Sequence, residues 1–180
     1  GREGDYLTCN EAYDPATDTW EVLPPLPEPR RDSAGAGFEG KVHVLGGDNG
    51  NQNLGSHLVY DPITRQWSEL TGFGDPRNSF AAVVANSKLY IVGDDNDAPI
   101  KVYDSTTDTW AASGEYFEYF DYCNAVAVGD DIHILGCDGL DHQHHVYNTT
   151  SHQYRLATDL PDDRVYENAV AIGDNIYLVG

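Results

Sequence analysis

The residues best suited to chemistry form a cluster of carboxylates and histidines in the last third of the chain. The segment that follows Cys137 contains Asp138, Asp141, His142 and His144. Imidazole nitrogens and carboxylate oxygens are ligands of zinc and related transition metals. Alternate residues of a strand share one face, so His142 and His144 are able to meet a single ion. A histidine pair without a clear third ligand is also typical of a solvated strand, and both interpretations stay open.

A second acidic run offers a different kind of metal ligand. Residues 94–97 read Asp-Asp-Asn-Asp, and their hard oxygen atoms suit calcium. The spacing is not that of an EF-hand loop, so the pattern is unspecific. The sequence therefore predicts no cofactor, with calcium or a transition metal kept as the alternatives.

Three arginines recur at one fixed distance from a glycine. Arg30, Arg77 and Arg164 each stand sixteen residues before a glycine that closes a strand. Arginine and tyrosine are the usual anchors of protein interfaces. The predicted ligand-binding residues are these arginines and their neighbours: Arg30, Arg31, Arg77, Asn78, Tyr119, Tyr122, Arg164 and Tyr166. In an alternative role, compatible with the first, the arginines pair with nearby aspartates.

The elements that carry these residues come from a fourfold repeat. Each unit has a tyrosine, an Asp-rich turn, an aromatic seven residues after the tyrosine, and a strand that ends in glycine. The units run over Tyr13 to Gly46, Tyr60 to Gly93, Tyr103 to Gly136 and Tyr147 to Gly180. The tyrosines are 47, 43 and 44 residues apart. A period of this size is typical of a propeller, a solenoid or an array of stacked units.

Each unit is predicted to contain four short strands. Alternating apolar runs at 41–45, 88–92, 131–135 and 175–179 are rich in β-branched and aromatic residues. Runs of small residues precede them at 33–37, 80–84, 123–127 and 167–171, and short polar turns join the two as hairpins. The tyrosine and tryptophan segments supply two further strands. Four strands in about 45 residues correspond to one propeller blade, and the small residues fit the crowded central axis.

On these motifs the chain resembles the kelch family. The resemblance rests on the glycine doublet at Gly46 and Gly47, the Tyr-Asp-Pro turns at Tyr13 and Tyr60, and the repeated tryptophans. It implies an all-β, kelch-type propeller of four-stranded antiparallel blades. It also implies that the tyrosines and tryptophans pack between blades, and that the loop surface at the channel mouth holds partner peptides.

Residues 1–180 are expected to form one domain with no linker between units. Residues 1–23 supply the last two strands of a blade, and residues 165–180 supply the first two. Two arrangements follow. Either four blades close, with both ends of the sequence sharing one blade, or the chain is part of a larger propeller, since the resemblance implies six blades more often than four.

The overall charge restricts the partners. Thirty acidic and ten basic residues give a net charge of −20, which disfavours nucleic acid. No apolar run is long enough to cross a membrane. The expected partner is therefore a protein, a peptide or a polar small ligand. Of the three cysteines, Cys123 and Cys137 face each other across one hairpin, where two buried thiols are favoured over a disulfide.

These observations favour a non-catalytic binding module. No activated nucleophile with a base, no paired carboxylates and no phosphate-binding glycine loop has a specific signature in this sequence. The alternative is the propeller domain of a carbohydrate-active or metal-dependent enzyme, whose active site would use the same channel mouth.

Overall fold

Three complete antiparallel sheets make up most of the molecule. The computed structural model describes residues 5–93, 99–113, 122–138, 142–163 and 168–179. The first sheet contains β3 (Ala34–Phe38), β4 (Lys41–Leu45), β5 (His57–Asp61) and β6 (Gln66–Leu70). The second contains β7 (Ala81–Ala85), β8 (Lys88–Val92), β9 (Lys101–Asp104) and β10 (Thr109–Ala112), and the third contains β11 (Asn124–Val128), β12 (Asp131–Leu135), β13 (His145–Asn148) and β14 (Tyr154–Leu156).

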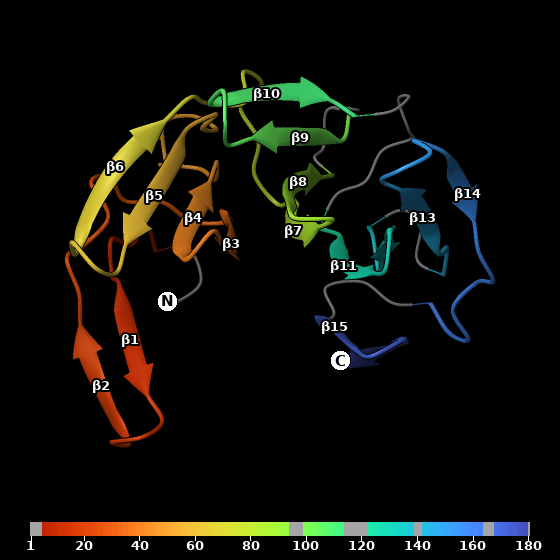
Figure 1. The fold of residues 1–180 in the computed structure, drawn as a ribbon, viewed down its shortest axis with the longest axis horizontal. Helices are drawn as coiled ribbons and strands as arrows, with labels where there is room; N and C mark the ends of the chain where they lie inside the picture. The colour runs from red at the N-terminus through yellow and green to blue at the C-terminus, as the bar shows by residue number, and fades with distance from the viewer. Residues whose placement is uncertain (1–4, 94–98, 114–121, 139–141, 164–167, 180) are drawn as a thin grey trace.

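The sheets stand side by side along an arc, with their first strands innermost (Figure 1). Strand β3 packs against β7, and β7 packs against β11. The small residues of these strands permit this approach, as the sequence predicts. The four second strands match their predicted ranges, and the first strands lie one residue later than predicted. None of the described residues forms a helix able to cross a membrane.

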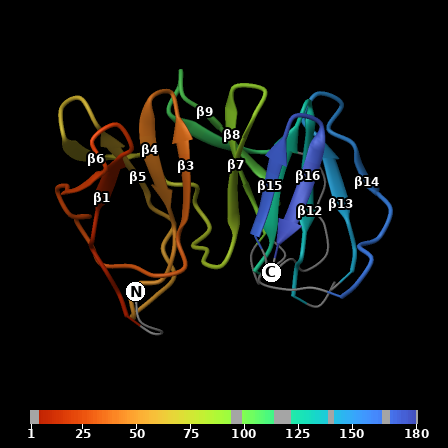
Figure 2. The ribbon, with the colours of Figure 1, turned by 90° about the horizontal axis from the view of Figure 1, so that it is seen from below.

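A two-stranded sheet lies at each end of the arc. One contains β1 (Glu11–Asp14) and β2 (Thr19–Val22), and the other contains β15 (Asn168–Ile172) and β16 (Asn175–Val179). They are separate sheets, and Figures 1 and 2 show them apart. Over the described residues the structure is an open arc, so the closed four-bladed alternative is not the arrangement seen here.

The tyrosine-containing turns are built on a side-chain hydrogen bond. In every unit the residue after the tyrosine accepts the N–H two positions further on. The first three acceptors are aspartates and the last is Asn148, with N–H to Oδ1 distances of 2.8, 2.8, 2.9 and 3.1 Å. This Asx arrangement explains why Asp and Asn recur there. Each turn ends at a residue with positive φ: Asp18, Arg65, Asp108 and His152.

Large aromatic residues fill the space between neighbouring sheets. The Trp67 Nε1–H donates to the carbonyl oxygen of Pro24 at 2.9 Å, and the Trp110 Nε1–H donates to that of Thr71 at 3.0 Å. Both bonds join a sheet to the one before it in the chain. The expected packing role is thus seen for these two tryptophans, whereas Trp20 at the open end is 71% exposed.

A disulfide joins Cys123 and Cys137, which corrects the expectation of two buried thiols. Cys123 lies directly before β11 and Cys137 lies two residues after β12. The hairpin register therefore brings the two side chains together at the open end of the hairpin. Both residues are buried, while Cys9 is a free and exposed thiol.

Candidate binding face

Loops that follow second strands and loops that precede first strands meet on one side of the arc, here called the loop face. Its described core consists of residues 30–33, 46–56 and 76–79. Isolated β-bridges join Arg31 to Asp48 and Leu54 to Arg77. The Gly47 N–H also donates to the Arg77 carbonyl at 2.8 Å. These loops are therefore tied to each other by backbone bonds.

Gly46 and Gly47 permit this close approach. A Cβ atom on Gly46 would lie 2.6 Å from the Arg77 carbonyl oxygen, and one on Gly47 would lie 2.6 Å from the Arg31 carbonyl oxygen. Both glycines also have positive φ, 53° and 95°. The doublet is thus required by contact between sheets as well as by the turn.

A belt of backbone hydrogen bonds runs from sheet to sheet under this face. Asp32, Ser79 and Tyr122 occupy equivalent positions, two residues after Arg30, Arg77 and Phe120 in the sequence. All three have left-handed φ values, 51°, 56° and 51°. The Ser79 N–H donates to the Asp32 carbonyl at 3.1 Å, and the Tyr122 N–H donates to the Ser79 carbonyl at 3.0 Å. This conformation is uncommon for residues other than glycine, and here it repeats once per sheet.

Arg30 and Arg77 lie beneath the face and are buried. Each donates to the carbonyl oxygen of the glycine sixteen residues later, at 2.9 Å for Gly46 and 3.3 Å for Gly93. Arg77 also bonds to the Pro99 carbonyl oxygen at 3.0 Å and pairs with Asp75. The sixteen-residue spacing thus reflects a hydrogen bond from each arginine side chain to the backbone of its glycine, here called an arginine clamp. Both guanidinium groups hold the loops in place through these bonds.

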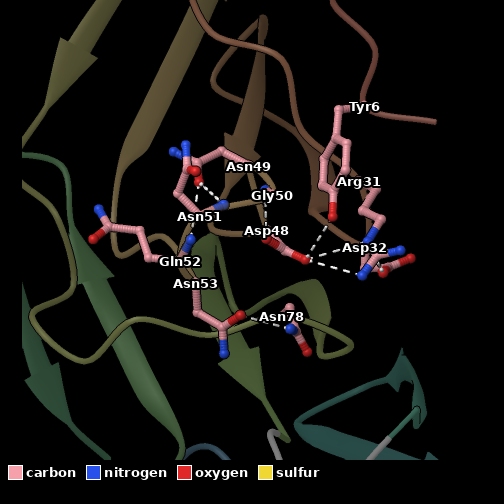
Figure 3. A network of polar contacts seen from close by, with 10 residues as sticks. All are labelled: Tyr6, Arg31, Asp32, Asp48, Asn49, Gly50, Asn51, Gln52, Asn53 and Asn78. Atoms are coloured by element: carbon pink, nitrogen blue, oxygen red, sulfur yellow. Dashed lines mark hydrogen bonds and ion pairs between the residues drawn. The ribbon is translucent and has the colours of Figure 1, made fainter. Parts of the chain in front are cut away.

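Arg31 lies at the surface in a network with Asp48 and Tyr6 (Figure 3). Its Nη2 is 3.0 Å from Asp48 Oδ2, and its guanidinium lies 5.0 Å from the centre of the Tyr6 ring. The Tyr6 hydroxyl donates to the same carboxylate oxygen at 3.3 Å. The Gly50 N–H, and with it Arg31, holds the pKa of Asp48 below its ordinary value. Asp48 is therefore ionised at neutral pH.

The loop of residues 48–53 is held by its own side chains. Asn49 Oδ1 accepts the N–H groups of Asn51 and Gln52, at 3.0 and 3.1 Å, and the Asn49 amide donates to Glu28. Asn53 Oδ1 accepts from the Asn78 amide at 2.7 Å (Figure 3). The loop tip, Asn51 and Gln52 included, stays exposed. The result is a polar surface with fixed donors and acceptors.

The predicted ligand-binding residues thus occupy two depths. Arg31, Asn78 and Tyr122 belong to the loop face, whereas Arg30 and Arg77 lie beneath it. Tyr119, Arg164 and Tyr166 lie outside the described residues. The sequence interpretation did not include Tyr6 or Asn53 in the site. Their contacts depend on the path of the loops, which the repeat spacing does not specify.

His142 and His144, two of the predicted metal ligands, contact different side chains in the structure. His142 Nδ1 lies 3.2 Å from Asp163 Oδ1, whereas His144 Nε2 lies 2.8 Å from His133 Nδ1. Asp138 is exposed, and Asp141 lies outside the described residues, as do residues 94–97. Among the residues that are described, no three His, Cys, Asp or Glu side chains come together to hold a metal ion. The metal site remains a prediction.

The sequence interpretation did not identify two histidine pairs that join second strands to the starts of third strands. His43 Nδ1 lies 2.7 Å from His57 Nε2, and the pair of His133 and His144 repeats this arrangement in the third sheet. Burial, and after it the neighbouring His43, lowers the pKa of His57 to about 4. Their position in the repeat could have indicated these pairs, because His57 and His144 each stand three residues before a repeat tyrosine.

Comparisons with known proteins agree with this architecture. The structure of YjhT aligns over 93% of this chain and 70% of that chain, with a TM-score of 0.76 and 17% sequence identity. At this identity the likeness shows the fold, an all-β propeller type with four-stranded antiparallel sheets.

Comparisons of sequence find kelch repeats in the first part of the chain. The kelch motif matches residues 1–27 and 29–74. One F-box/kelch-repeat protein of Arabidopsis thaliana is 49% identical over 35 residues, which is 19% of this chain and 9% of that protein. Another from the same organism is 40% identical over 47 residues, 26% of this chain and 12% of that protein. Residues 1–74 of the chain therefore carry kelch repeats, and kelch repeats are generally protein-interaction modules.

Proposed function

We propose that this chain is a non-catalytic binding module that holds a peptide segment of a protein partner on its loop face. The observation that supports this role is the network around Arg31 and Asp48. Polar groups from three chain segments, the exposed Arg31 and the partly buried Asp48 and Tyr6, are fixed there on a backbone frame that arginine clamps and β-bridges hold. Variable polar loops on a rigid scaffold are a common recognition surface.

The chemistry of the face suits an extended peptide. Arg31 offers a cation, Asp48 offers an ionised carboxylate, and the amides of Asn51 and Gln52 offer both donors and acceptors. Such a mixture matches the alternating N–H and C=O groups of a peptide backbone. The fixed loop loses little conformational freedom on binding, which favours affinity.

In this proposal the predicted site residues divide their work. Arg31, Asn78 and Tyr122, with Tyr119 and Tyr166, contact the partner. Arg30 and Arg77 are positioning residues that keep the loops in register, and Arg164 would act as they do.

The direct experiment uses the purified chain as bait for partners in an extract, with mass spectrometry of what is retained. The double variant Arg31→Ala, Asn51→Ala removes exposed groups of the loop face and should lose the retained partner. Arg31 is about half-exposed in its side chain, so the fold should persist.

The matched control lies on the opposite side of the arc. Thr17→Ala and Thr106→Ala change exposed residues in the turns between third and fourth strands, and they should retain the partner. Equal retention by the loop-face and turn variants would refute the proposal, as would loss from the turn variants alone.

A further inference from the structure

A cavity of about 200 Å³ lies between the first and second complete sheets. Its apolar wall is formed by Val59, Leu70 and Tyr103, and its polar groups come from Glu39, Lys41, His43, Ser68 and Ser105. None of the described loop-face residues lines it, so it is separate from the binding surface proposed above. A cavity of about 150 Å³ in another protein holds benzene, so this one has room for a single substituted ring.

The equivalent space between the second and third sheets is filled by the protein's own phenol ring. Tyr90 is the third residue of β8, as His43 is of β4. The Tyr90 side chain is buried in one cluster with Tyr147. Burial raises the pKa of Tyr90, and a side-chain hydrogen bond with Thr149 acts in the opposite direction. Thr149 stands two residues after its repeat tyrosine, as Ser105 does. The phenol of Tyr90 therefore spans the space that the smaller His43 ring leaves open.

The two interfaces share the same frame around this space. Across the first interface, the Ser105 hydroxyl donates to Glu39 at 2.7 Å. Across the second, Asn86 occupies the place of Glu39 and donates to Thr149, also at 2.7 Å. Because the frames are alike, histidine in place of tyrosine accounts for the cavity.

The charges and polar atoms of the wall favour a neutral ligand with a hydroxyl group. Lys41 Nζ already lies 3.6 Å from Asp61 Oδ2, and Glu39 is acidic, so the wall does not attract an anion. His43 Nδ1 lies 2.7 Å from His57 Nε2, while the buried His43 Nε2 has no hydrogen-bond partner among the described residues. A hydrocarbon would leave such a buried nitrogen unsatisfied, which is unusual in folded proteins.

We propose that this cavity binds a small neutral phenol. The ring packs against Val59, Leu70 and Tyr103, and the hydroxyl donates to Ser105 Oγ, whose own proton is directed to Glu39. A serine oxygen accepts while its hydroxyl donates, so both bonds are compatible. The ligand thus occupies the first interface as the Tyr90 side chain occupies the second.

Calorimetric titration of the purified chain with p-cresol, the side-chain analogue of tyrosine, tests this site. One molecule should bind per chain, with a Kd on the order of 1 mM for a ligand of this size. Toluene lacks the hydroxyl and should bind about fivefold more weakly. His43→Tyr reproduces the arrangement of the second interface, fills the cavity, and should weaken p-cresol binding about tenfold or more.

Two further variants keep the result unambiguous. His133→Tyr makes the same change at the third residue of β12 and should leave the affinity for p-cresol unchanged. Ser105→Ala changes an exposed residue, so the fold should persist, and it should weaken binding about fivefold. No saturable binding of p-cresol, equal affinity for toluene, or equal affinity of the unchanged chain and His43→Tyr would each overturn the proposal.

Discussion

At the scale of single residues, two arginines that stand next to each other in the sequence have opposite roles. Arg30 is buried in the frame, and its neighbour Arg31 is exposed on the face. Sequence spacing predicted that both lie at the channel mouth, but it did not separate them. Their depth depends on which side of the strand each side chain leaves, and the repeat fixes that only once the register is known.

Arg77→Ala should destabilise the fold far more than Arg31→Ala. The fully buried Arg77 bonds two carbonyl oxygens and pairs with Asp75. Its loss removes the bonds to both carbonyl oxygens, while Asp75 keeps its ion pair with Lys101, and should cost about 3 kcal/mol in the free energy of unfolding. Arg31→Ala removes an exposed, solvent-screened ion pair and should change the free energy of unfolding much less. Urea denaturation compares the two, and equal losses would show that Arg77 is not a clamp.

The hydroxyl groups of equivalent tyrosines should differ in their contribution to stability. Tyr103 donates to Asp108 at 2.8 Å, but Arg65 occupies the matching place for Tyr60, whose buried hydroxyl has no hydrogen-bond partner among the described residues. Tyr103→Phe should therefore lower the free energy of unfolding by about 1 kcal/mol, and Tyr60→Phe should leave it nearly unchanged. Denaturation of both variants tests this, and a larger loss from Tyr60→Phe would contradict it.

At the scale of elements, the buried pair of His43 and His57 should make the first sheet sensitive to acid. The folded-state pKa of His57 is lowered to about 4, by burial first and then by His43, so the unfolded chain takes up its proton near pH 6.5 before the folded chain does. Stability from this group is complete above pH 6.5 and is lost as pH falls toward 4. The expected loss is about 3 kcal/mol at pH 4.

Urea unfolding at several pH values measures this loss. His57→Gln should flatten the slope between pH 6.5 and 4, because glutamine does not titrate. Carboxylates such as Asp61, whose pKa is lowered mainly by backbone N–H groups, lose their contribution only below about pH 4. An unchanged slope in the variant would assign the acid sensitivity to other groups.

The disulfide should stabilise one hairpin and with it the third sheet. It closes a loop with a sequence separation of 14 residues. A disulfide that closes a loop of this length stabilises a fold by about 3 kcal/mol, because it restricts the unfolded chain. The double variant Cys123→Ala, Cys137→Ala should unfold at a correspondingly lower urea concentration. Mass measurement after thiol labelling without reductant should detect only Cys9 in the native chain, and labelling of all three would disprove the bond.

The regular parts of these elements could be predicted from the sequence. The alternation of apolar residues predicts both ends of each second strand correctly, because one face of each strand must be buried. The belt through Asp32, Ser79 and Tyr122 was not predictable in the same way. No shared residue type marks these three positions in the sequence, because contacts between sheets impose their left-handed φ values. The disulfide was missed because hairpin geometry permits both a bond and two buried thiols.

At the scale of the whole molecule, the arrangement of the sheets and the chemistry of the loop face are set by different parts of the sequence. Kelch-type repetition fixes how sheets follow one another, but the ligand depends on loops that differ from unit to unit. The loop of residues 48–53 shows this, since its hydrogen bonds are specific to the first unit.

Amide hydrogen exchange, with and without the captured partner, tests the central claim that the loop face is the binding surface. The account predicts new protection in residues 30–33, 46–56 and 76–79, with exchange unchanged in the turns at 14–19, 61–66 and 104–109. Protection confined to those turns, with the loop face exchanging as before, would contradict it.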